Sequence, residues 1–379
     1  MFEIDTALRS LIEREGSDLH VKVGTPPTIR QHGELVHLEG YGPLSNEDTE
    51  KAFHDIAETR SLTEFEQAGE ADFSYSIPGL SRFRVNVFKQ RGSTSIVCRA
   101  IPFDIRSVDD LGLPPVVTKL AEEQRGIILV TGTTGSGKST TLAAMIDHIN
   151  RTRDHHIITL EDPIEYLHED KRSIVNQREV GSDTESFARA MRRVLRQDPD
   201  VILIGEMRDE ETVRTALSAA ETGHLVLSTV HTLDATETIN RIVDFFPPHL
   251  QHQARVMMAA TLKGAIAQRL VPDISGEGRV PASEVMIVTG RVQDLIMNPE
   301  ETGKITEVIS EGEYYGMRTF DQSLLGYVME GKVSEQTALD YASSPHDFKL
   351  MLAAGGQRAS GIEQLSGAAE TAEPVSAPQ

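Results

Sequence analysis

The stretch GTTGSGKS at residues 132–139 constrains the fold more than any other part of the sequence. It directly follows the apolar run IILVT at residues 127–131. Gly132, Gly137, Lys138 and Ser139 occupy the fixed positions of a phosphate-binding loop between a buried strand and a helix. A plain glycine-rich turn would not need the lysine, the serine and the preceding strand together. The pattern therefore predicts a strand, a phosphate-binding loop and a helix, in that order.

Each residue type in this loop has a chemical reason. Glycines let the backbone turn its N–H groups inward, and the N-terminus of the following helix adds partial positive charge. Lys138 is expected to reach the β- and γ-phosphates, and the Ser139 hydroxyl is expected to take a place on Mg²⁺. The expected nucleotide-binding residues are Gly132, Thr133, Thr134, Gly135, Ser136, Gly137, Lys138, Ser139 and Thr140.

Length, apolar content and cysteine count indicate which class of protein this chain belongs to. The chain has 379 residues, 39% of them hydrophobic, which is enough for two domains and a tail. No segment approaches the ~18 uninterrupted apolar residues that a membrane helix needs. The first residues, MFEIDTALRS, do not resemble a signal peptide. The single cysteine, Cys98, excludes an intramolecular disulfide and a four-cysteine zinc site. Together these features predict a cytoplasmic protein.

Residues 1–100 are predicted to form a small α+β domain with an antiparallel sheet, followed by a linker at 101–115 that contains three prolines. The expected elements are a helix at 3–16, a strand at 17–23, a hairpin at 28–38, a helical segment at 46–69, and strands at 72–77, 82–88 and 93–99.

Residues 116–352 show a different pattern, in which buried strands alternate with helices. Continuous apolar runs between helical patterns indicate a parallel sheet with helices on both faces. A mostly helical region is predicted from 235 to 352, and residues 353–379 are expected to be disordered because they contain few large apolar groups. The expected buried strands lie at 127–131, 156–160, 201–204 and 224–228.

Three later stretches could supply the groups that hydrolysis needs. ITLEDPIEY ends a strand with Glu161, Asp162 and Glu165, and ligands in open α/β sheets sit beyond the carboxyl ends of strands. DPDVILIGE ends an apolar strand at Glu206, which fits an acid that holds Mg²⁺ through water. TGHLVLSTVHT ends a strand at His231, near where a γ-phosphate could be sensed. The alternatives are an acidic surface loop, a plain core strand and an ordinary surface histidine.

Four ordered motifs carry a family resemblance: GTTGSGKSTT, ITLEDPIEY, DPDVILIGEMRD and TGHLVLSTVHT. They resemble the Walker A, Asp box, Walker B and His box of the type II/IV secretion ATPases. With GSDLHVKVGTPPTIRQHGEL, RFRVNVFKQRG and GMRTFDQSLL, the chain resembles the pilus retraction ATPases of twitching motility over residues 3–350. The resemblance implies an α/β fold: a RecA-like P-loop NTPase core with a smaller N-terminal PAS-like α+β domain and a helical C-terminal region.

The same resemblance implies roles and partners. Glu165 would be the general base, Glu206 the Walker B acid and His231 the γ-phosphate sensor. Arg84 and Arg99 would reach the nucleotide from the N-terminal domain, a task that suits the arginine side chain; the alternative is that both are outward-facing strand residues. The implied activity is ATP hydrolysis with Mg²⁺. The implied assembly is a homohexamer that works with an inner-membrane pilus platform protein at the inner face of the cytoplasmic membrane.

The resemblance has one departure. The retraction family usually carries a helical motif close to AIRNLIR, and this chain has GRVQDLI at residues 290–296, so Gln293 and Asp294 replace the arginine–asparagine pair. A retraction accessory paralogue, or a motor for another filament, therefore remains an alternative. An extension ATPase is disfavoured because that relative usually carries four cysteines for zinc, whereas this chain has one.

Two functions from other classes fit the sequence less well. A nucleic-acid translocase could use a basic stripe, which at helical spacing would comprise Arg189, Arg192, Arg193 and Arg196. A net charge of −21 and the lack of interleaved aromatic residues disfavour DNA, so we interpret the stripe as contacts to a neighbouring subunit or as a solvated face. A nucleotide-gated adaptor without turnover is disfavoured because Glu165 and Glu206 are both intact.

Overall fold

The computed structural model describes residues 2–102 and 104–354. The chain forms two compact units. The first unit contains the chain up to Ile105 together with Asn150–Pro199. The second contains Arg106–Ile149 together with the chain from Asp200 onward. Each unit carries some of the predicted site residues.

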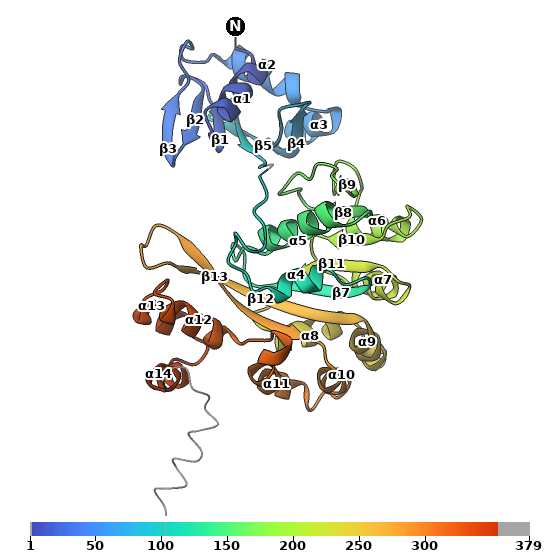
Figure 1. Ribbon diagram of the computed structural model, residues 1–379. Helices are drawn as coiled ribbons and strands as arrows, with labels where there is room; N and C mark the ends of the chain where they lie inside the picture. The colour runs from blue at the N-terminus through green and yellow to red at the C-terminus, as the bar shows by residue number, and fades with distance from the viewer. Residues whose placement is uncertain (1, 103, 355–379) are drawn as a thin grey trace, which may run out of the picture. The chain divides into compact units, whose positions relative to one another are not determined.

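The first unit begins with a six-stranded antiparallel sheet in the order β3-β2-β1-β6-β5-β4 (Figure 1). Three helices pack on one face of it, where Leu8, Phe53, Phe83 and Ile96 belong to one buried core. The elements are α1 (Ile4–Glu13), β1 (Asp18–Val21), β2 (Thr28–Gln31), β3 (Glu34–His37), α2 (Asn46–Ile56), α3 (Thr59–Ala68), β4 (Glu70–Ile77), β5 (Ser81–Gln90) and β6 (Ser93–Ala100).

Strand β5 alternates between core and outer face. Phe83, Val85 and Val87 are buried, whereas Arg82 and Arg84 point the other way. Successive side chains of a strand lie on opposite faces. The apolar residues that build the core therefore place both arginines together on the outer face of the sheet.

The first unit also contains two parallel strands and a helix from further along the chain. β8 (His156–Glu161) and β9 (Ile174–Glu179) pair in register, so that Glu161 lies beside Glu179. Helix α6 (Phe187–Val194) packs against β8. The strand predicted at 156–160 is confirmed. Strand β9 was not predicted, because its sequence IVNQRE is polar and the strand is only partly buried.

In the second unit, strands lie in the order β13-β12-β7-β11-β10. Neighbours from β12 to β10 are parallel, and β13 is antiparallel to β12. All residues of β7, β11 and β10 are buried, as the predicted apolar runs require. The strands are β7 (Gly126–Thr131), β10 (Val201–Ile204), β11 (Leu225–Val230), β12 (Leu262–Pro272) and β13 (Arg279–Ile287). Helix α4 (Val116–Ala121) precedes these strands, and the helices between them are α5 (Lys138–Thr152), α7 (Glu210–Glu221), α8 (Ala235–Asp244) and α9 (Pro248–Thr261).

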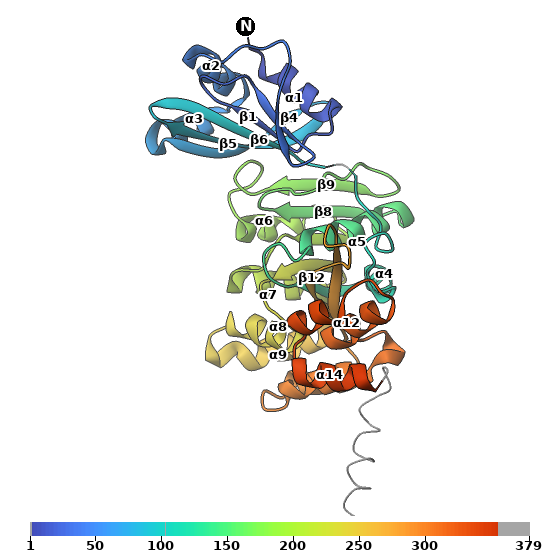
Figure 2. The ribbon, with the colours of Figure 1, turned by 90° about the vertical axis from the view of Figure 1, so that its left-hand side faces the viewer.

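The prediction of a mostly helical region over 235–352 is wrong for β12 and β13. The β12 sequence LKGAIAQRLVP is rich in helix-forming residues, but nine of its eleven residues pair with β13 and the strand also pairs with β7. Burial between two strands overrides local propensity. Short helices follow: α10 (Gly290–Met297), α11 (Ile305–Glu311), α12 (Phe320–Met329), α13 (Glu335–Tyr341) and α14 (Pro345–Ala353). Figure 2 shows α12 beside α14, where Phe320 and Phe348 share a core with Val271.

The expected α/β fold class is confirmed. The predicted domain boundaries at 100 and 115 do not coincide with the two compact units, and that division stays a prediction. Of the tail predicted to be disordered, Ala353 ends helix α14 and residues 355–379 lie outside the described residues. Across 2–102 and 104–354, no helix combines the length and the apolar character needed to span a bilayer.

Candidate nucleotide site

The predicted phosphate-binding loop connects the end of β7 to the start of α5. Gly132, Gly135 and Gly137 have φ angles of 140°, 79° and 91°, a region that favours glycine. A Cβ at Gly132 would lie 2.4 Å from the carbonyl oxygen of Gln268 on β12. Backbone conformation and the close approach of the neighbouring strand therefore both require glycine at position 132.

Lys138 and Ser139 open helix α5. Lys138 Nζ donates to the carbonyl oxygens of Gly132 at 2.9 Å and Thr133 at 2.8 Å. Burial lowers the pKa of Lys138, while the charge of Glu206 acts in the opposite direction. Ser139 is exposed. The loop thus presents an ammonium group held by backbone carbonyls and an accessible hydroxyl at a helix N-terminus.

Glu206 and His231 follow neighbouring parallel strands and meet at the same edge of the sheet. Ile204 of β10 pairs with Ser228 of β11, and His231 Nε2 lies 3.4 Å from Glu206 Oε2. Arg208 forms an ion pair with the other carboxylate oxygen of Glu206. The Glu206 side chain is only 12% exposed. Its carboxylate is therefore held between a histidine and an arginine.

The loop belongs to the same edge. Val230 of β11 pairs with Thr131 of β7, and these are the residues immediately before His231 and Gly132. The carboxyl ends of β7, β11 and β10 therefore bring Gly132, His231 and Glu206 into one row. This is where open α/β sheets bind ligands.

His224 has a different environment from His231. It precedes β11, and its Nδ1 lies 2.9 Å from the carbonyl oxygen of Ala219 in α7. This contact joins the strand to the preceding helix. Of the two histidines that flank the strand, only His231 lies at the ligand-binding edge.

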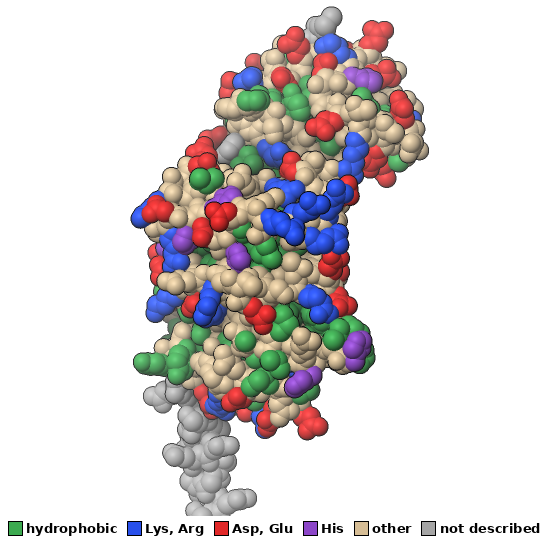
Figure 3. All heavy atoms as spheres, turned by 90° about the vertical axis from the view of Figure 1, so that its right-hand side faces the viewer, with side chains coloured by type: hydrophobic (Ala, Val, Ile, Leu, Met, Phe, Trp, Pro, Cys, Tyr) green, Lys and Arg blue, Asp and Glu red, His purple; other side chains and the backbone are tan. Residues whose placement is uncertain are grey.

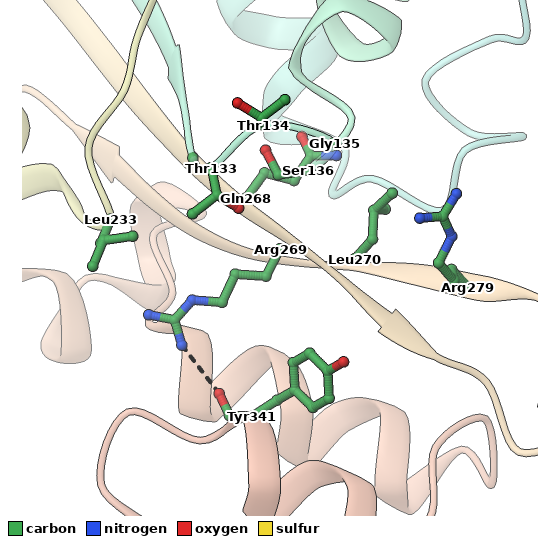
Figure 4. A pocket seen from close by; sticks show the side chains of 11 residues that line it. Thr133, Thr134, Gly135, Ser136, Leu233, Gln268, Arg269, Leu270, Arg279 and Tyr341 are labelled. Carbon is green, nitrogen blue, oxygen red and sulfur yellow. Dashed lines mark hydrogen bonds between the residues drawn. The ribbon is translucent and has the colours of Figure 1, made fainter.

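A pocket of about 290 Å³ lies beside the loop (Figure 4). Arg269 Nη1 donates to the carbonyl oxygen of Tyr341 at 3.0 Å, and its guanidinium carbon lies 4.0 Å from the centroid of the Phe320 ring. These contacts hold helices α12 and α13 against β12 at the wall of the pocket. The lining residues are Gly132, Thr133, Thr134, Gly135, Ser136, Leu233, Gln268, Arg269, Leu270, Arg279 and Tyr341.

In the first unit, the acidic residues at and just after the end of β8 lie in two different environments. Glu161 accepts hydrogen bonds from Thr159 Oγ1 at 2.6 Å and Gln177 Nε2 at 3.1 Å, and burial raises its pKa. Glu165 is about half exposed, and its Oε1 lies 3.9 Å from Arg84 Nη1. The Glu161 carboxylate is therefore partly buried and hydrogen-bonded within the unit, whereas Glu165 presents an accessible carboxylate beside an arginine.

Arg99 lies opposite Arg84 across the β5–β6 pair but has its own acidic partner. Its Nε donates to Asp18 Oδ1 at 2.8 Å, and Asp18 is its partner across the β1–β6 pair. Burial raises the pKa of Asp18, but hydrogen bonds from Ser17 and Arg99 outweigh burial, so that pKa is lowered overall. The structure thus pairs Arg84 with Glu165 and Arg99 with Asp18.

The predicted basic stripe lies on and just after α6. Arg189, Arg192, Arg193 and Arg196 are all exposed, and Arg189 forms an ion pair with Glu185. Figure 3 shows lysine and arginine side chains gathered on the face that carries this helix. The stripe is a surface feature, and its role as a subunit contact stays a prediction.

Sequence reasoning missed several residues around these sites. Arg208 lies two positions after Glu206 within the quoted motif, so its contact with that acid was open to prediction. Asp18 meets Arg99 because β1 pairs with β6, and Gln268 lies on β12, which pairs with β7 up to Ala267. Gln268 Oε1 accepts from Thr141 of α5 at 2.8 Å, beside the loop. No local pattern marks either residue.

Comparison with known proteins identifies the same family that the sequence motifs resemble. A family described as Type II/IV secretion system protein matches residues 67–280. The type IV pilus retraction ATPase PilT of Pseudomonas aeruginosa is 44% identical over 90% of this chain and 99% of its own length. The type IV pilus ATPase PilU of the same organism is 39% identical over 94% of this chain and 92% of its own. The crystal structure of the pilus retraction motor PilT with bound ADP superposes with a TM-score of 0.83 at 45% identity, covering 93% of this chain and 100% of that one.

Proposed function

The chain belongs to the type II/IV secretion ATPases, and within them to the pilus retraction ATPases, so it is an ATP hydrolase; we propose that it is the motor that powers type IV pilus disassembly in twitching motility. The row of Gly132, His231 and Glu206 at the carboxyl ends of three neighbouring strands carries the proposal. It combines phosphate binding with an acid and a sensor at one edge of a sheet.

The loop binds the triphosphate. Backbone N–H groups of residues 132–137 and the N-terminus of α5 attract the phosphates, and Lys138 exchanges its carbonyl partners for phosphate oxygens. Nucleotide binding agrees with the ADP found in the related PilT structure. His231, next to Glu206, senses the γ-phosphate through its imidazole.

Ser139 and Glu206 fit the coordination of Mg²⁺. A hydroxyl and a carboxylate are oxygen donors of the type this ion prefers. In the described part of the chain, no cluster of three or more acidic, histidine or cysteine side chains could hold a metal ion; Ser139 and Glu206 would hold the ion together with the nucleotide phosphates. When bound, Mg²⁺ supplies positive charge that neutralises the β- and γ-phosphates.

Glu165 acts as the general base that polarises the attacking water. Its carboxylate is accessible to a water molecule and lies 3.9 Å from Arg84 Nη1, and a positioned carboxylate is a common general base. Arg84 and Arg99 stabilise charge on the phosphates, because guanidinium groups match phosphate geometry. For Arg99 this role requires release from Asp18.

The working assembly is a homohexamer that acts on an inner-membrane pilus platform protein, so the motor lies in the cytoplasm at the inner face of the membrane. The resemblance to the retraction ATPases supports this assignment. Staggered closure around ATP and opening on release would convert hydrolysis into a directional stroke. The stripe of arginines at α6 is a candidate contact between neighbouring subunits.

One observation favours a second candidate, a retraction accessory motor. Gln293 and Asp294 on α10 replace the arginine–asparagine pair of the retraction motif. Deleting the gene in its host separates the candidates. A principal retraction motor predicts accumulation of surface filaments and complete loss of surface motility, whereas an accessory motor predicts a partial loss.

The enzymatic core of the proposal is tested with Glu165→Gln. The isosteric amide keeps the shape of the side chain but does not accept a proton. We expect phosphate release by the purified protein to fall by at least about 100-fold, and the variant should not restore motility to the deletion strain. Release at the parental rate would overturn the assignment of the base.

A further inference from the structure

Glu179, the last residue of β9, gathers four polar groups around one buried carboxylate. Oε1 accepts from Ser74 Oγ at 2.6 Å and from Ser182 Oγ at 3.3 Å. Oε2 accepts from the backbone N–H of Ile164 at 3.1 Å and lies 3.3 Å from Arg82 Nη2. The Glu179 side chain is only 5% exposed. A buried carboxylate with this many partners is expensive to move away from any of them.

The partners of Glu179 come from separate parts of the first unit. Ser74 and Arg82 lie on β4 and β5 of the N-terminal sheet. Ile164 lies in the segment after β8, immediately before Glu165. One side chain therefore ties two strands of the N-terminal sheet to the backbone next to the proposed base.

Two further side chains, Gln177 and Glu161, hold the backbone of the segment around Glu165. Gln177 Nε2 donates to the carbonyl oxygen of Tyr166 at 2.8 Å, and Gln177 Oε1 accepts from the N–H of His168 at 2.8 Å. The partly buried Glu161 carboxylate accepts the backbone N–H of Glu165. With the backbone fixed on both sides, the direction of the Glu165 side chain depends on these anchors.

Strand β5 reaches this segment at two points. Arg82 contacts it through Glu179, and Arg84, two residues along the same face, lies 3.9 Å from Glu165 itself. Between these contacts, a cavity of about 520 Å³ is lined by residues of both sides, among them Ser76 and Asp162. The contacts of Arg82 with Glu179 and of Arg84 with Glu165 therefore connect β5 to the segment at the wall of this cavity.

We propose that Glu179 is a positioning residue that couples the N-terminal sheet to Glu165: movement of β4 and β5 is transmitted through the Glu179 carboxylate to the backbone that aims the base. The inference rests on the proposed role of Glu165. Ser74 and Arg82 would need to stay bound to Glu179 whenever Glu165 is in its working position, so loss of either contact should misdirect the base without weakening nucleotide binding.

The test measures steady-state ATP hydrolysis of purified full-length Glu179→Gln, Arg82→Ala and the double variant. Glutamine keeps an acceptor for Ser74 and Ile164 but lacks the charge that binds Arg82. We expect each single variant to lower kcat by about tenfold, with KM for ATP within about threefold of the parent. The double variant should lose no more than the larger single loss, because both changes break the same contact. Arg82→Lys should recover part of kcat.

Asp154→Asn is the matched control. Asp154 binds Arg172 at 2.7 Å in the same unit, but both side chains are exposed, so kcat should stay at the parental value. A parental kcat in Glu179→Gln, or losses that multiply in the double variant, would overturn the coupling. A rise in KM with unchanged kcat would do the same, because it would place Glu179 in ligand binding. If Glu165→Gln is inactive while Glu179→Gln is fully active, only this inference fails.

Discussion

His231 Nε2 lies 3.4 Å from Glu206 Oε2 because β11 and β10 are parallel neighbours whose carboxyl ends reach the same edge of the sheet. The pair leads to a first prediction. Glu206→Gln should lower kcat by about 100-fold while ATP still binds, because the carboxylate that supports Mg²⁺ is lost. His231→Ala should lower kcat less, by about tenfold. Phosphate release and binding of a fluorescent nucleotide measure the two effects separately.

A matched control for that pair is His224→Ala. His224 flanks the same strand, but its ring contacts Ala219 and not the row of site residues. This variant should lose some thermal stability and keep its kcat per folded molecule. Equal losses of kcat in the His224 and His231 variants would contradict the assignment of His231.

Lys138→Ala should weaken ATP binding by at least about tenfold and leave the protein folded. The ammonium group is nearly buried against two carbonyl oxygens, and burial lowers its pKa, so its removal costs the fold little. Titration with nucleotide and thermal unfolding test both parts. Lys304→Ala removes an exposed lysine that pairs with Glu301 and should change neither quantity. Unaltered affinity in Lys138→Ala would argue against the loop as the phosphate site.

The two N-terminal arginines should behave differently. Arg84→Ala is expected to abolish turnover with nucleotide affinity within a few-fold of the parent, because Arg84 already lies near the proposed base. Arg99→Ala leaves the buried Asp18 without its guanidinium partner. It should therefore also lower the free energy of unfolding by about 1 kcal/mol. Adding Asp18→Asn should restore that stability but not kcat. Unchanged kcat in Arg84→Ala would refute its catalytic role.

Glu284 should make stability fall as the pH rises. It lies on β13, accepts the backbone N–H of Ala235 at 2.9 Å and faces Asp234, Arg269 and Asp321. Burial raises its pKa from 4.5 to about 7. The folded state therefore binds the proton more tightly than the unfolded chain does, and this stabilisation is complete below about pH 4.5 and lost as the pH rises through about 7.

Glu284→Gln removes this titration. Relative to the parent, the variant should gain on the order of 2 kcal/mol of stability between pH 5 and pH 8. Urea unfolding of both proteins at the two pH values gives the difference. A variant whose stability changes with pH as steeply as that of the parent would show that Glu284 does not titrate in this range.

Local patterns were sufficient where the chemistry is local. The loop at 132–139, the strand before it and the helix after it could all be predicted, because spacing along the chain decides how glycines, a lysine and a serine surround a phosphate. Period-two alternation along β5 also places Arg84 away from the core, where Phe83 and Val85 are buried; this outward orientation was the alternative expected for Arg84 from the sequence.

Those local patterns could not predict which strands, distant in the sequence, pair with one another. The side chains of LKGAIAQRLVP permit a helix, and only burial between β7 and β13 makes β12 a strand. The register of β1 against β6, not a motif, gives Arg99 its partner Asp18. Glu179 ends a polar strand that looks like surface, and its partners come from β4, β5 and the segment before Glu165.

The order of residues alone therefore determined the phosphate loop, the succession of buried strands and the set of acids and histidines that follow them. Tertiary structure alone decided which of these groups touch. Contacts between distant segments depend on strand order and register, and the free energy that selects them comes from burial summed over whole sheets rather than from any short stretch.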